Sequence, residues 1–418
     1  MATPAPKYPV VVIGGGIAGI TAAVEAAECG AKAVLLEKRA HLGGRVARMH
    51  KYFPKLCAPY CGLELNFRRI RENPDITVHA RAEVTDISGQ YGDFTLKVKQ
   101  QPQMVNANCT ACGKCAEVCP VERQDHYNYG MGKTKAIYMP HPMAFPQRYN
   151  ISRKACRGKE CNKCVEVCQY GAIDLDARET EFEMKAHAVV LATGWDPYDG
   201  AKLHGLSFGA SPNVISNVMM ERLAAPEGPT KGKLLRPSDG KEVREVVFAQ
   251  CAGSRDENHL PYCSSVCCLA SLKHAAYVRE AVPDAKITIY YIDIRTPGKY
   301  ERFYQKIAAD PKVTLIKGKI GRAEHDAETG GVIITAEDVL AGKKITHKAD
   351  LLVIATGMQP AARRGVGGVK TDENGFFVDA ALARGIYAAG TARLPQDVSS
   401  TIMDATAAAL KAIYGGRP

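Results

Sequence analysis

The sequence contains no long hydrophobic run. No stretch reaches the roughly eighteen consecutive apolar residues that a membrane-spanning helix needs, so the chain is not expected to cross a membrane. The first seven residues contain neither an apolar segment nor a twin arginine, and no export signal is expected. Arginine runs and basic stretches interleaved with aromatic residues are also missing, so a nucleic-acid partner is not expected. These absences favour a cytoplasmic protein with reduced thiols.

Cysteine, by contrast, is abundant, in a chain of 418 residues that is long enough for two or three domains. Twelve of the fifteen cysteines form three groups. The first run has the C-x2-C-x2-C-x3-C-P spacing of bacterial ferredoxins, in which the fourth cysteine binds the neighbouring iron–sulfur cluster. It comprises Cys109, Cys112, Cys115 and Cys119, followed by Pro120. The second run has a longer first gap and comprises Cys156, Cys161, Cys164 and Cys168.

Cross-ligation between the two runs predicts two clusters. Cluster one would be held by Cys109, Cys112, Cys115 and Cys168. Cluster two would be held by Cys156, Cys161, Cys164 and Cys119, of which Cys156 departs from the ferredoxin spacing. Zinc is the alternative metal, but zinc sites do not call for paired four-cysteine runs with a three-residue final gap.

The N-terminal segment has the pattern of a dinucleotide-binding βαβ unit. An apolar run ending at Ile13 is typical of a buried parallel strand, and the glycine-rich turn after it opens an alanine-rich helix. A second apolar run, 33–36, ends in Glu37, which is placed to accept hydrogen bonds from the adenosine ribose. The pyrophosphate is expected at the helix N-terminus. The cofactor-binding residues expected here are Gly14, Gly16, Ala18, Gly19, Glu37, Lys38, Gly44 and Arg45.

The other end of the chain favours FAD over NAD. A strand-like segment enters a glycine turn at Gly390, and 399–401 is expected to cap a final helix. In flavoproteins of the thioredoxin-reductase type, such a segment returns to the first domain and directs its helix N-terminus at the flavin. That family usually has Gly-Asp where this chain has Gly390-Thr391, so the ribityl contact of the aspartate is not carried over. The resemblance, which includes two ATG segments, adds to the expected cofactor contacts Ala192, Thr193, Gly194, Gly357, Gly390, Thr391 and Thr401.

The third cysteine group is irregular and comprises Cys251, Cys263, Cys267 and Cys268. It lies in a second predicted βαβ unit, with strands over 246–250 and 287–292 and a helix over 264–279. A two-dinucleotide flavoprotein would bind NAD(P) at this place, but cysteines stand where the glycine-rich loop would be. We predict a third cluster; the alternative is four buried or partly free thiols.

Together these patterns predict an α/β, thioredoxin-reductase-like flavoprotein with two dinucleotide-binding-type domains and an inserted ferredoxin-like α+β module. The FAD-binding domain is expected in three parts, 1–100, 179–240 and 351–418. The insert is expected over 101–178, and a degenerate nicotinamide-type domain over 241–350. The expected cofactors are FAD and three 4Fe–4S clusters.

The cysteine segments resemble those of a known family. Cys251-Ala-Gly-Ser-Arg-Asp followed by Tyr262-Cys-Ser-Ser-Val-Cys-Cys268 is similar to the atypical cluster motif of the heterodisulfide reductase A-subunit. The run Cys109–Pro120 and the segment Lys135-Ala-Ile-Tyr-Met-Pro140 fit the same resemblance. The chain begins at the flavin strand and ends after the closing helix. That layout is similar to the A-subunit of the quinone-interacting membrane-bound oxidoreductase of sulfate reducers.

The second resemblance implies partners and a location. Such a subunit sits with a second flavin and iron–sulfur subunit and a haem-bearing membrane subunit, in a complex that links the menaquinone pool to adenylylsulfate reductase. The chain is then expected to be cytoplasmic and peripheral on the inner face of the cytoplasmic membrane. The alternative is a soluble, electron-bifurcating subunit of the heterodisulfide reductase type.

Resemblance also nominates Lys273 and Glu221 as catalytic residues near flavin N5. A lysine there can stabilise an anionic reduced flavin, and a carboxylate can tune it or relay protons. The alternative is that both are solvated helix charges. Cys57 and Cys61 are expected to be structural thiols, with a place near the flavin or a partner as the alternative, and Cys29 is expected in the core.

Three classes of function fit these features. The first is an electron-transfer subunit with no small-molecule substrate of its own. The second is an NAD(P)-dependent flavin oxidoreductase, against which the missing second glycine loop counts. The third is a structural metal protein.

Overall fold

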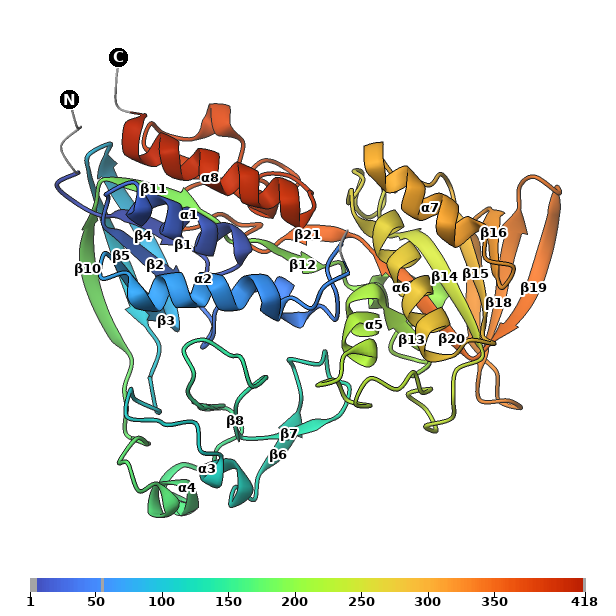
Figure 1. Ribbon diagram of the computed structural model, residues 1–418, viewed down its shortest axis with the longest axis horizontal. Coiled ribbons are helices and arrows are strands. Elements are labelled where there is room, and N and C mark those ends of the chain that lie inside the picture. The colour runs from blue at the N-terminus through green and yellow to red at the C-terminus, as the bar shows by residue number, and fades with distance from the viewer. Residues whose placement is uncertain (1–5, 54–55, 416–418) are drawn as a thin grey trace.

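The computed structural model describes residues 6–53 and 56–415. The first five residues, on which the expectation of no export signal partly rests, lie outside this range. Two α/β domains lie side by side, and a smaller insert lies beneath them (Figure 1). Within the described residues, no helix combines the length and apolar character needed to cross a membrane.

The first α/β domain is built on a parallel sheet in the order β22-β11-β1-β2-β3. Its strands are β1 (Val10–Ile13), β2 (Ala33–Glu37), β3 (Ile76–Ala80), β11 (Ala188–Leu191) and β22 (Ile386–Ala388). The strands are continuously apolar because both faces of the sheet are covered. Alternate residues of β1 face opposite layers: Val10 and Val12 belong to one core cluster, and Val11 and Ile13 to another.

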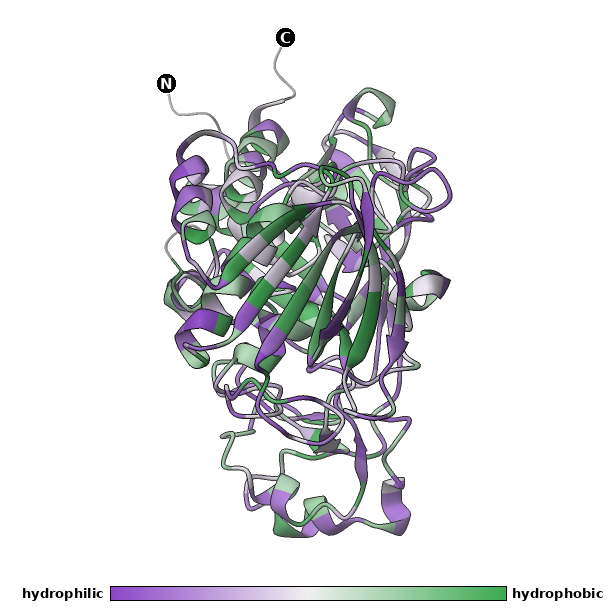
Figure 2. Cartoon of the chain, turned by 90° about the vertical axis from the view of Figure 1, so that its right-hand side faces the viewer, coloured by the Kyte–Doolittle hydropathy of each residue, from purple (hydrophilic) through white to green (hydrophobic). Residues whose placement is uncertain are grey.

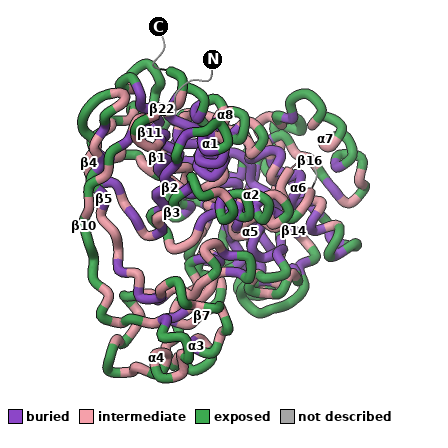
Figure 3. The backbone as a smooth tube through the Cα atoms, turned by 60° about the vertical axis from the view of Figure 1, so that its left-hand side comes forward, coloured by how far each residue is buried: buried purple, intermediate pink, exposed green. Residues whose placement is uncertain are grey.

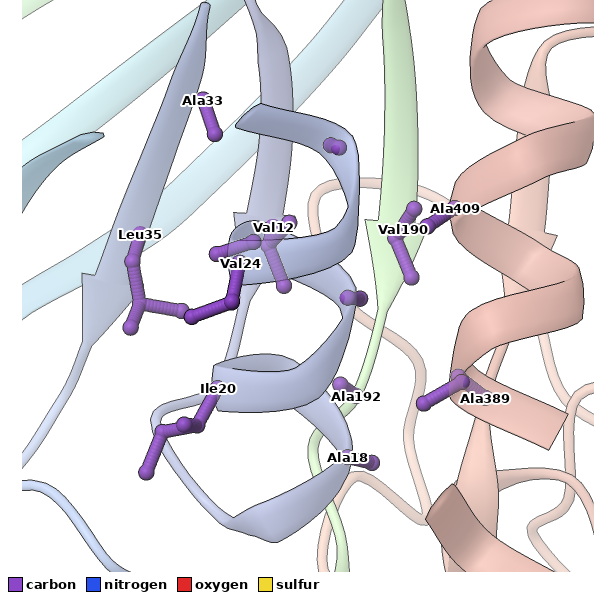
Figure 4. Close-up of a cluster of buried hydrophobic side chains, with 14 of the residues drawn as sticks. Val12, Ala18, Ile20, Val24, Ala33, Leu35, Val190, Ala192, Ala389 and Ala409 are labelled. Carbon is purple, nitrogen blue, oxygen red and sulfur yellow. The ribbon is translucent and has the colours of Figure 1, made fainter. Parts of the chain in front are cut away.

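Helices cover one face of this sheet, and a second sheet covers the other. The helices are α1 (Ile17–Glu28), α2 (Tyr60–Glu72) and α8 (Val398–Tyr414). Figure 4 shows α1 and α8 meeting over small side chains such as Ala18, Ala192, Ala389 and Ala409. The opposite face packs on an antiparallel sheet of β4 (Ala82–Gln90), β5 (Asp93–Gln100) and β10 (Thr180–Ala186).

The second α/β domain repeats this plan. Its parallel sheet runs β13-β20-β14-β15-β16. The strands are β13 (Val214–Ser216), β14 (Glu245–Ala252), β15 (Lys286–Tyr291), β16 (Val313–Lys317) and β20 (Leu351–Thr356). One face packs on α5 (Asn217–Ala224), α6 (Cys267–Ala281) and α7 (Glu301–Ala308). The other packs on β17 (Ile320–His325), β18 (Val332–Asp338) and β19 (Lys343–Ala349). Figure 2 faces this domain and shows the hydrophobic interiors of its strands.

The sheet pairing corrects two of the expected domain boundaries. β13 and β20 pair in the second sheet, although they lie in segments that we expected to belong to the FAD-binding domain, 179–240 and 351–418. A short buried strand carries no signal of which parallel sheet it joins, so the sequence could not decide this. The chain crosses between the domains through the antiparallel pair β12 (Trp195–Pro197) and β21 (Met358–Pro360).

The insert is a small α+β module with little core. Its elements are α3 (Lys114–Glu117), α4 (Lys163–Val167), β6 (Glu122–Gln124), β7 (Lys133–Lys135), β8 (Ile137–Tyr138) and β9 (Asn150–Ile151). Figure 3 shows this part mostly exposed or half-buried, unlike the two domains above it. Its buried cluster includes Met104, Val105, Ile137 and Ile151 together with Cys115. So small a core is consistent with a module that needs bound metal clusters to stabilise its fold.

Three local expectations are wrong. Cys29 follows α1 and is exposed, because the helix ends there, so it is not a core residue. The final helix begins at Val398 and is capped by Asp397, whose side chain accepts from the Ser400 N–H at 2.7 Å, rather than by 399–401. The second-domain helix begins at Cys267 and not at residue 264.

Candidate functional site

A large cavity of about 1370 Å³ lies between the two α/β domains. This volume exceeds the roughly 300–1,000 Å³ of ordinary small-molecule pockets, as an extended dinucleotide requires. Twelve of the expected cofactor-binding residues line it. They are Gly14, Gly16, Ala18, Glu37, Lys38, Gly44, Arg45, Ala192, Thr193, Gly194, Thr391 and Thr401.

The glycine turn after β1 leaves room for a phosphate group. Gly14 has a φ of 112°, and an added Cβ there would overlap the Ala192 carbonyl. Gly16 and Gly44 face each other, and a Cβ on Gly44 would lie 2.8 Å from the Gly16 Cα. The turn leads into the N-terminus of α1, where unpaired N–H groups favour an anion. The residues therefore fit the pyrophosphate of a dinucleotide.

Glu37 lies at the end of β2 and is almost fully buried. Its carboxylate accepts from the Gly15 N–H at 2.6 Å and from the Arg39 N–H at 2.7 Å. Burial raises the pKa of Glu37, and these two hydrogen bonds oppose that effect. The carboxylate thus fixes the glycine turn and lines the cavity where a ribose is expected.

Other polar groups are aimed into the same cavity. Arg45 Nε donates to the Trp195 carbonyl at 3.0 Å, and its guanidinium also pairs with Asp196. Thr193 Oγ1 is buried and has no hydrogen-bond partner within the part of the chain that the structure describes. A buried hydroxyl of this kind is normally satisfied, so an acceptor or donor from a bound ligand fits here.

Three expected cofactor residues do not line the cavity. Gly19 lies on α1 against the glycine turn, where an added Cβ would overlap the Gly14 carbonyl oxygen. Gly390 packs against Ala18 and Thr401, with which its added Cβ would collide at 2.9 Å. Gly357 lies at the end of β20, next to Ser254 and Ser264 of the third cysteine group. Gly19 and Gly390 therefore shape the site through close packing, and Gly357 belongs to the second domain.

The expected catalytic pair lies on the other wall of the cavity. Glu221 comes from α5 and Lys273 from α6, and they are only 7% and 4% exposed, which excludes solvated helix charges. Lys273 Nζ lies 2.7 Å from Glu221 Oε1 and donates to the Lys51 carbonyl at 2.6 Å. Both residues line the cavity. The pair therefore brings a buried, compensated charge to the wall of the cavity.

A network that the sequence did not suggest surrounds Glu221. His274 Nε2 lies 2.6 Å from Oε1, and the His50 N–H and the Tyr277 hydroxyl lie 3.0 and 3.2 Å from Oε2. Burial alone would raise the pKa of Glu221, but Lys273 and His274 hold that pKa well below its usual range. Burial lowers the pKa of His274 against the opposing effect of Glu221. A neutral His274 that donates from Nε2 to the Glu221 carboxylate agrees with the lowered pKa of both groups.

Eight cysteines of the insert gather into two sets around two small cavities. One cavity is lined by Cys109, Cys112, Cys115 and Cys168. The other is lined by Cys119, Cys156, Cys161 and Cys164. These are the cross-ligated sets expected from the ferredoxin spacing. The loops bend through left-handed residues, Ala111 with φ 58° and Asn162 with φ 48°, which turn the thiols of each run inward.

The third group is brought together at the start of α6. β14 loses its register with β20 before Ala252, and Cys251 has a φ of 54°, which re-aims its side chain as a β-bulge does. Cys251 lies within hydrogen-bonding reach of Cys267, and Cys267 of Cys268. The contact with Cys267, helped by Arg255, lowers the pKa of the Cys251 thiol. The same contact raises the pKa of the Cys267 thiol, so the three thiols share their protons, and the case for a cluster here rests on their proximity.

Cys263, the fourth cysteine of this group, is half-buried. Its sulfur accepts from the Ser265 N–H at 3.4 Å and lies in the field of Arg295. Arg295 contacts Asp293 at 3.3 Å, and the Asp293 carbonyl lies 3.7 Å from Cys268 Sγ. Across residues 6–53 and 56–415, no three His, Cys, Asp or Glu side chains converge on a single metal ion. A cubane cluster differs from such a site because each thiolate binds its own iron.

Cys57 and Cys61 lie near Tyr52, a residue that lines the large cavity. Cys57 is half-buried, and Cys61 is exposed in the first turn of α2. Neither cysteine lines the cavity, and the expectation of structural thiols stays a prediction.

Comparisons with known proteins agree with the site. The family described as FAD dependent oxidoreductase matches residues 9–66. A thioredoxin reductase from Lactococcus lactis is similar in structure, with a TM-score of 0.52 and 16% identity over 97% of this chain and 98% of that protein. A thioredoxin reductase from T. acidophilum gives a TM-score of 0.52 with 17% identity, and covers 97% of both chains. The fold and the glycine-lined cavity therefore define a flavin oxidoreductase with two dinucleotide-binding-type domains.

Sequence relatives narrow this class. The A-subunit of the H(2):CoB-CoM heterodisulfide,ferredoxin reductase of Methanothermobacter marburgensis is 35% identical over 416 residues, 96% of this chain and 63% of that protein. A CoB–CoM heterodisulfide reductase iron-sulfur A-subunit of Methanopyrus kandleri is 37% identical, again over 96% of this chain and 63% of that protein. Over almost its whole length the chain is similar to heterodisulfide reductase A-subunits, and it spans about 63% of the length of these two relatives.

Proposed function

We propose that this chain is an FAD and iron–sulfur electron-transfer subunit of a heterodisulfide reductase-type complex. Bound FAD would supply the exchange between electron pairs and single electrons. The glycine turn and Glu37 would hold the dinucleotide. Lys273, fixed by Glu221 and the Lys51 carbonyl, would present a positive charge to the flavin ring.

The observation that carries this proposal is the sorting of eight insert cysteines into two sets of four in a chain that also has a dinucleotide-sized cavity. Each set draws three cysteines from one run and one from the other, as in two-cluster ferredoxins. A purely structural metal protein has no use for the large cavity. Two further features support redox chemistry: the third cysteine group and the buried Lys273–Glu221 pair.

The third cysteine group lies on the same helix as Lys273. Cys268 precedes Lys273 by five residues, which is about 7.5 Å along a helix. The group would therefore form a second electron route from the cavity, in a direction other than that of the insert. Two one-electron routes from one two-electron cofactor permit the splitting or merging of electron pairs.

The narrower prediction of a link between the menaquinone pool and adenylylsulfate reductase, with a haem-bearing membrane subunit as partner, stays a prediction. The sequence relatives are heterodisulfide reductase subunits, and they favour the alternative, a heterodisulfide reductase-type subunit. Partner subunits of that kind are part of the proposal.

An NAD(P)-dependent oxidoreductase is disfavoured by the loop after β14. In place of a glycine-rich turn into a helix N-terminus, the end of β14 and this loop carry Cys251 and Cys263, and the chain reaches α6 only at Cys267. We expect neither NADH nor NADPH to bind with micromolar affinity in calorimetry. Micromolar binding would favour the NAD(P)-dependent function instead.

The proposal is tested by replacing one cysteine in each insert set, Cys112→Ala and Cys161→Ala, in the protein assembled with its partner subunits under anaerobic conditions. After light-driven reduction of the flavin, electrons should reach the partner far more slowly in the double variant than in the wild type. Asn66→Leu on α2 serves as the matched control. An unchanged rate would show that the insert is not the electron route.

A further inference from the structure

The tip of the β6–β7 hairpin is one of the places where the insert touches the rest of the molecule; the segment from Phe145 to Asn150 is another, through Leu42, His41 and Arg81. The tip, Tyr127–Tyr129, projects from the insert toward the α/β domains (Figure 1). The hydroxyl of Tyr127 donates to the Ala47 carbonyl at 2.6 Å. The Tyr129 hydroxyl accepts from Arg45 Nη1 at 3.0 Å, and Tyr129 lines the large cavity. The tip therefore forms part of the wall of the flavin site.

The root of the same hairpin forms part of a cysteine site. Val121 and Ala136 flank β6 and β7, and both line the cavity that holds Cys119, Cys156, Cys161 and Cys164. Between root and tip, β6 and β7 pair over three positions, which is about 10 Å of strand. One short hairpin thus connects this cysteine set to the flavin cavity.

A buried arginine anchors the tip. Arg222 on α5 is 0% exposed and has no ion pair within the described residues. Its Nε donates to Asn128 Oδ1 at 2.7 Å, and the other nitrogens donate to the carbonyls of Arg48 and Glu227 at 3.3 and 3.2 Å. The insert, the FAD-binding domain and the second domain therefore meet at one guanidinium.

Asn128 is itself held in position for this contact. Its Nδ2 donates to Asp125 Oδ2 at 2.7 Å, so its oxygen is left to face Arg222. The Tyr127 ring lies 4.9 Å from the Arg222 guanidinium and 5.0 Å from that of Arg48. A buried cation held only by neutral acceptors depends on each of them, because losing one leaves donors unsatisfied.

We propose that the Tyr127–Tyr129 tip is a docking element that holds the insert on the flavin cavity, with Asn128 and Arg222 as its positioning pair. Docking connects the set Cys119, Cys156, Cys161 and Cys164 to the cavity through one hairpin. The use of this connection for electrons rests on the proposed function, in which the insert carries electrons. The docking itself does not.

Hydrogen exchange on the FAD- and iron-loaded protein tests the docking. Asn128→Leu removes the acceptor for Arg222. We expect Asn128→Leu to speed amide exchange over 121–137 at least about tenfold, as the loss of a hydrogen bond to a charged group predicts. The control Asn66→Leu should leave exchange unchanged. FAD and iron contents should match the wild type in both variants.

Electron transfer from the flavin to the insert clusters is measured in the same samples. After light-driven reduction with a deazaflavin and EDTA, bleaching of the insert clusters should lag behind bleaching of the flavin in Asn128→Leu only. If Asn128→Leu does not accumulate, Tyr129→Phe removes only the hydroxyl that contacts Arg45 and should loosen the same amides. Unchanged exchange in both variants would overturn the docking proposal. Insert clusters that stay oxidised in the wild type would overturn the proposed function while leaving the exchange result standing.

Discussion

The loop after β1 and the loop after β14 occupy the same place in two similar βαβ units, yet they are built for different ligands. The first is a short glycine turn into α1, held from behind by the Glu37 carboxylate. The second is longer, bends at Cys251, and reaches α6 only at Cys267. An acidic residue follows the second strand in each unit, and in the second unit Asp293 pairs with Arg255 beside the cysteines. The same βαβ topology thus offers a phosphate-binding turn in the first domain and a group of cysteines in the second.

The difference depends on which backbone groups stay free. In the first unit, glycine keeps the helix N-terminus open to an anion. In the second, Tyr198 and Leu203 lie against Gly253, and Cys251 adopts a left-handed conformation that costs energy for a non-glycine residue. Such strain gathers at functional sites, which agrees with a ligand-binding role for Cys251.

The largest expected effect comes from closing the first loop. In Gly19→Ala the new Cβ would overlap the Gly14 carbonyl, so α1 cannot keep its approach to β1. We expect the purified variant to retain almost no FAD, measured as the flavin-to-protein ratio. The matched change in the second loop, Gly253→Ala, meets a side chain 2.8 Å away and should retain FAD. Equal flavin loss in Gly19→Ala and Gly253→Ala would contradict the claim that only the first loop holds the dinucleotide.

The second effect concerns α6, which carries both the third cysteine group and Lys273. Glu221→Gln leaves Lys273 buried without its counter-charge, which costs about 3–5 kcal/mol of stability. The variant should unfold at a clearly lower temperature at neutral pH. Asn66→Leu, on the surface of α2, should change the melting temperature little.

The pH dependence of that loss has a definite sign. In the folded protein, Lys273 and His274 lower the pKa of Glu221 against the effect of burial. The ionised carboxylate therefore contributes its full stability above the pKa of about 4.3 that a glutamate has in the unfolded chain. This stability is lost as the pH falls from that value toward the lower pKa of the folded state. The gap in melting temperature between wild type and Glu221→Gln should therefore stay constant from neutral to mildly acidic pH and narrow only below it. A gap that widens in acid would contradict the assigned pairing.

Much of this comparison could be predicted from the sequence. Strand periodicity, the glycine turn, Glu37 and the two ferredoxin-type runs are local patterns, and each depends on residues close together in the chain. Tyr129 and Arg222 escaped prediction because they meet their partners only where the insert packs on the two domains. His50 and His274 escaped it because only tertiary packing brings them to Glu221. A buried arginine has no signature in a single sequence. The prediction that Cys29 is buried was wrong because the alanine-rich helix that suggested burial ends at Glu28, one residue earlier.

The smallest expected effect is at the closing helix. Asp397→Ala removes the side chain that caps α8 and should cost about 1 kcal/mol, seen as a small fall in melting temperature. Ser399→Ala is the matched control, because residue 399 was expected to cap and does not. A larger loss for Ser399→Ala than for Asp397→Ala would reassign the cap.

The most direct test of the central claim, that a cluster replaces a phosphate in the second loop, is an iron count on anaerobically purified wild type and Cys251→Ala. Three 4Fe–4S clusters predict about twelve irons with one FAD in the wild type. Cys251→Ala should lose about four irons and keep its FAD, because the first loop is untouched. A wild-type count near eight that Cys251→Ala leaves unchanged would contradict the account and reduce the third group to buried thiols.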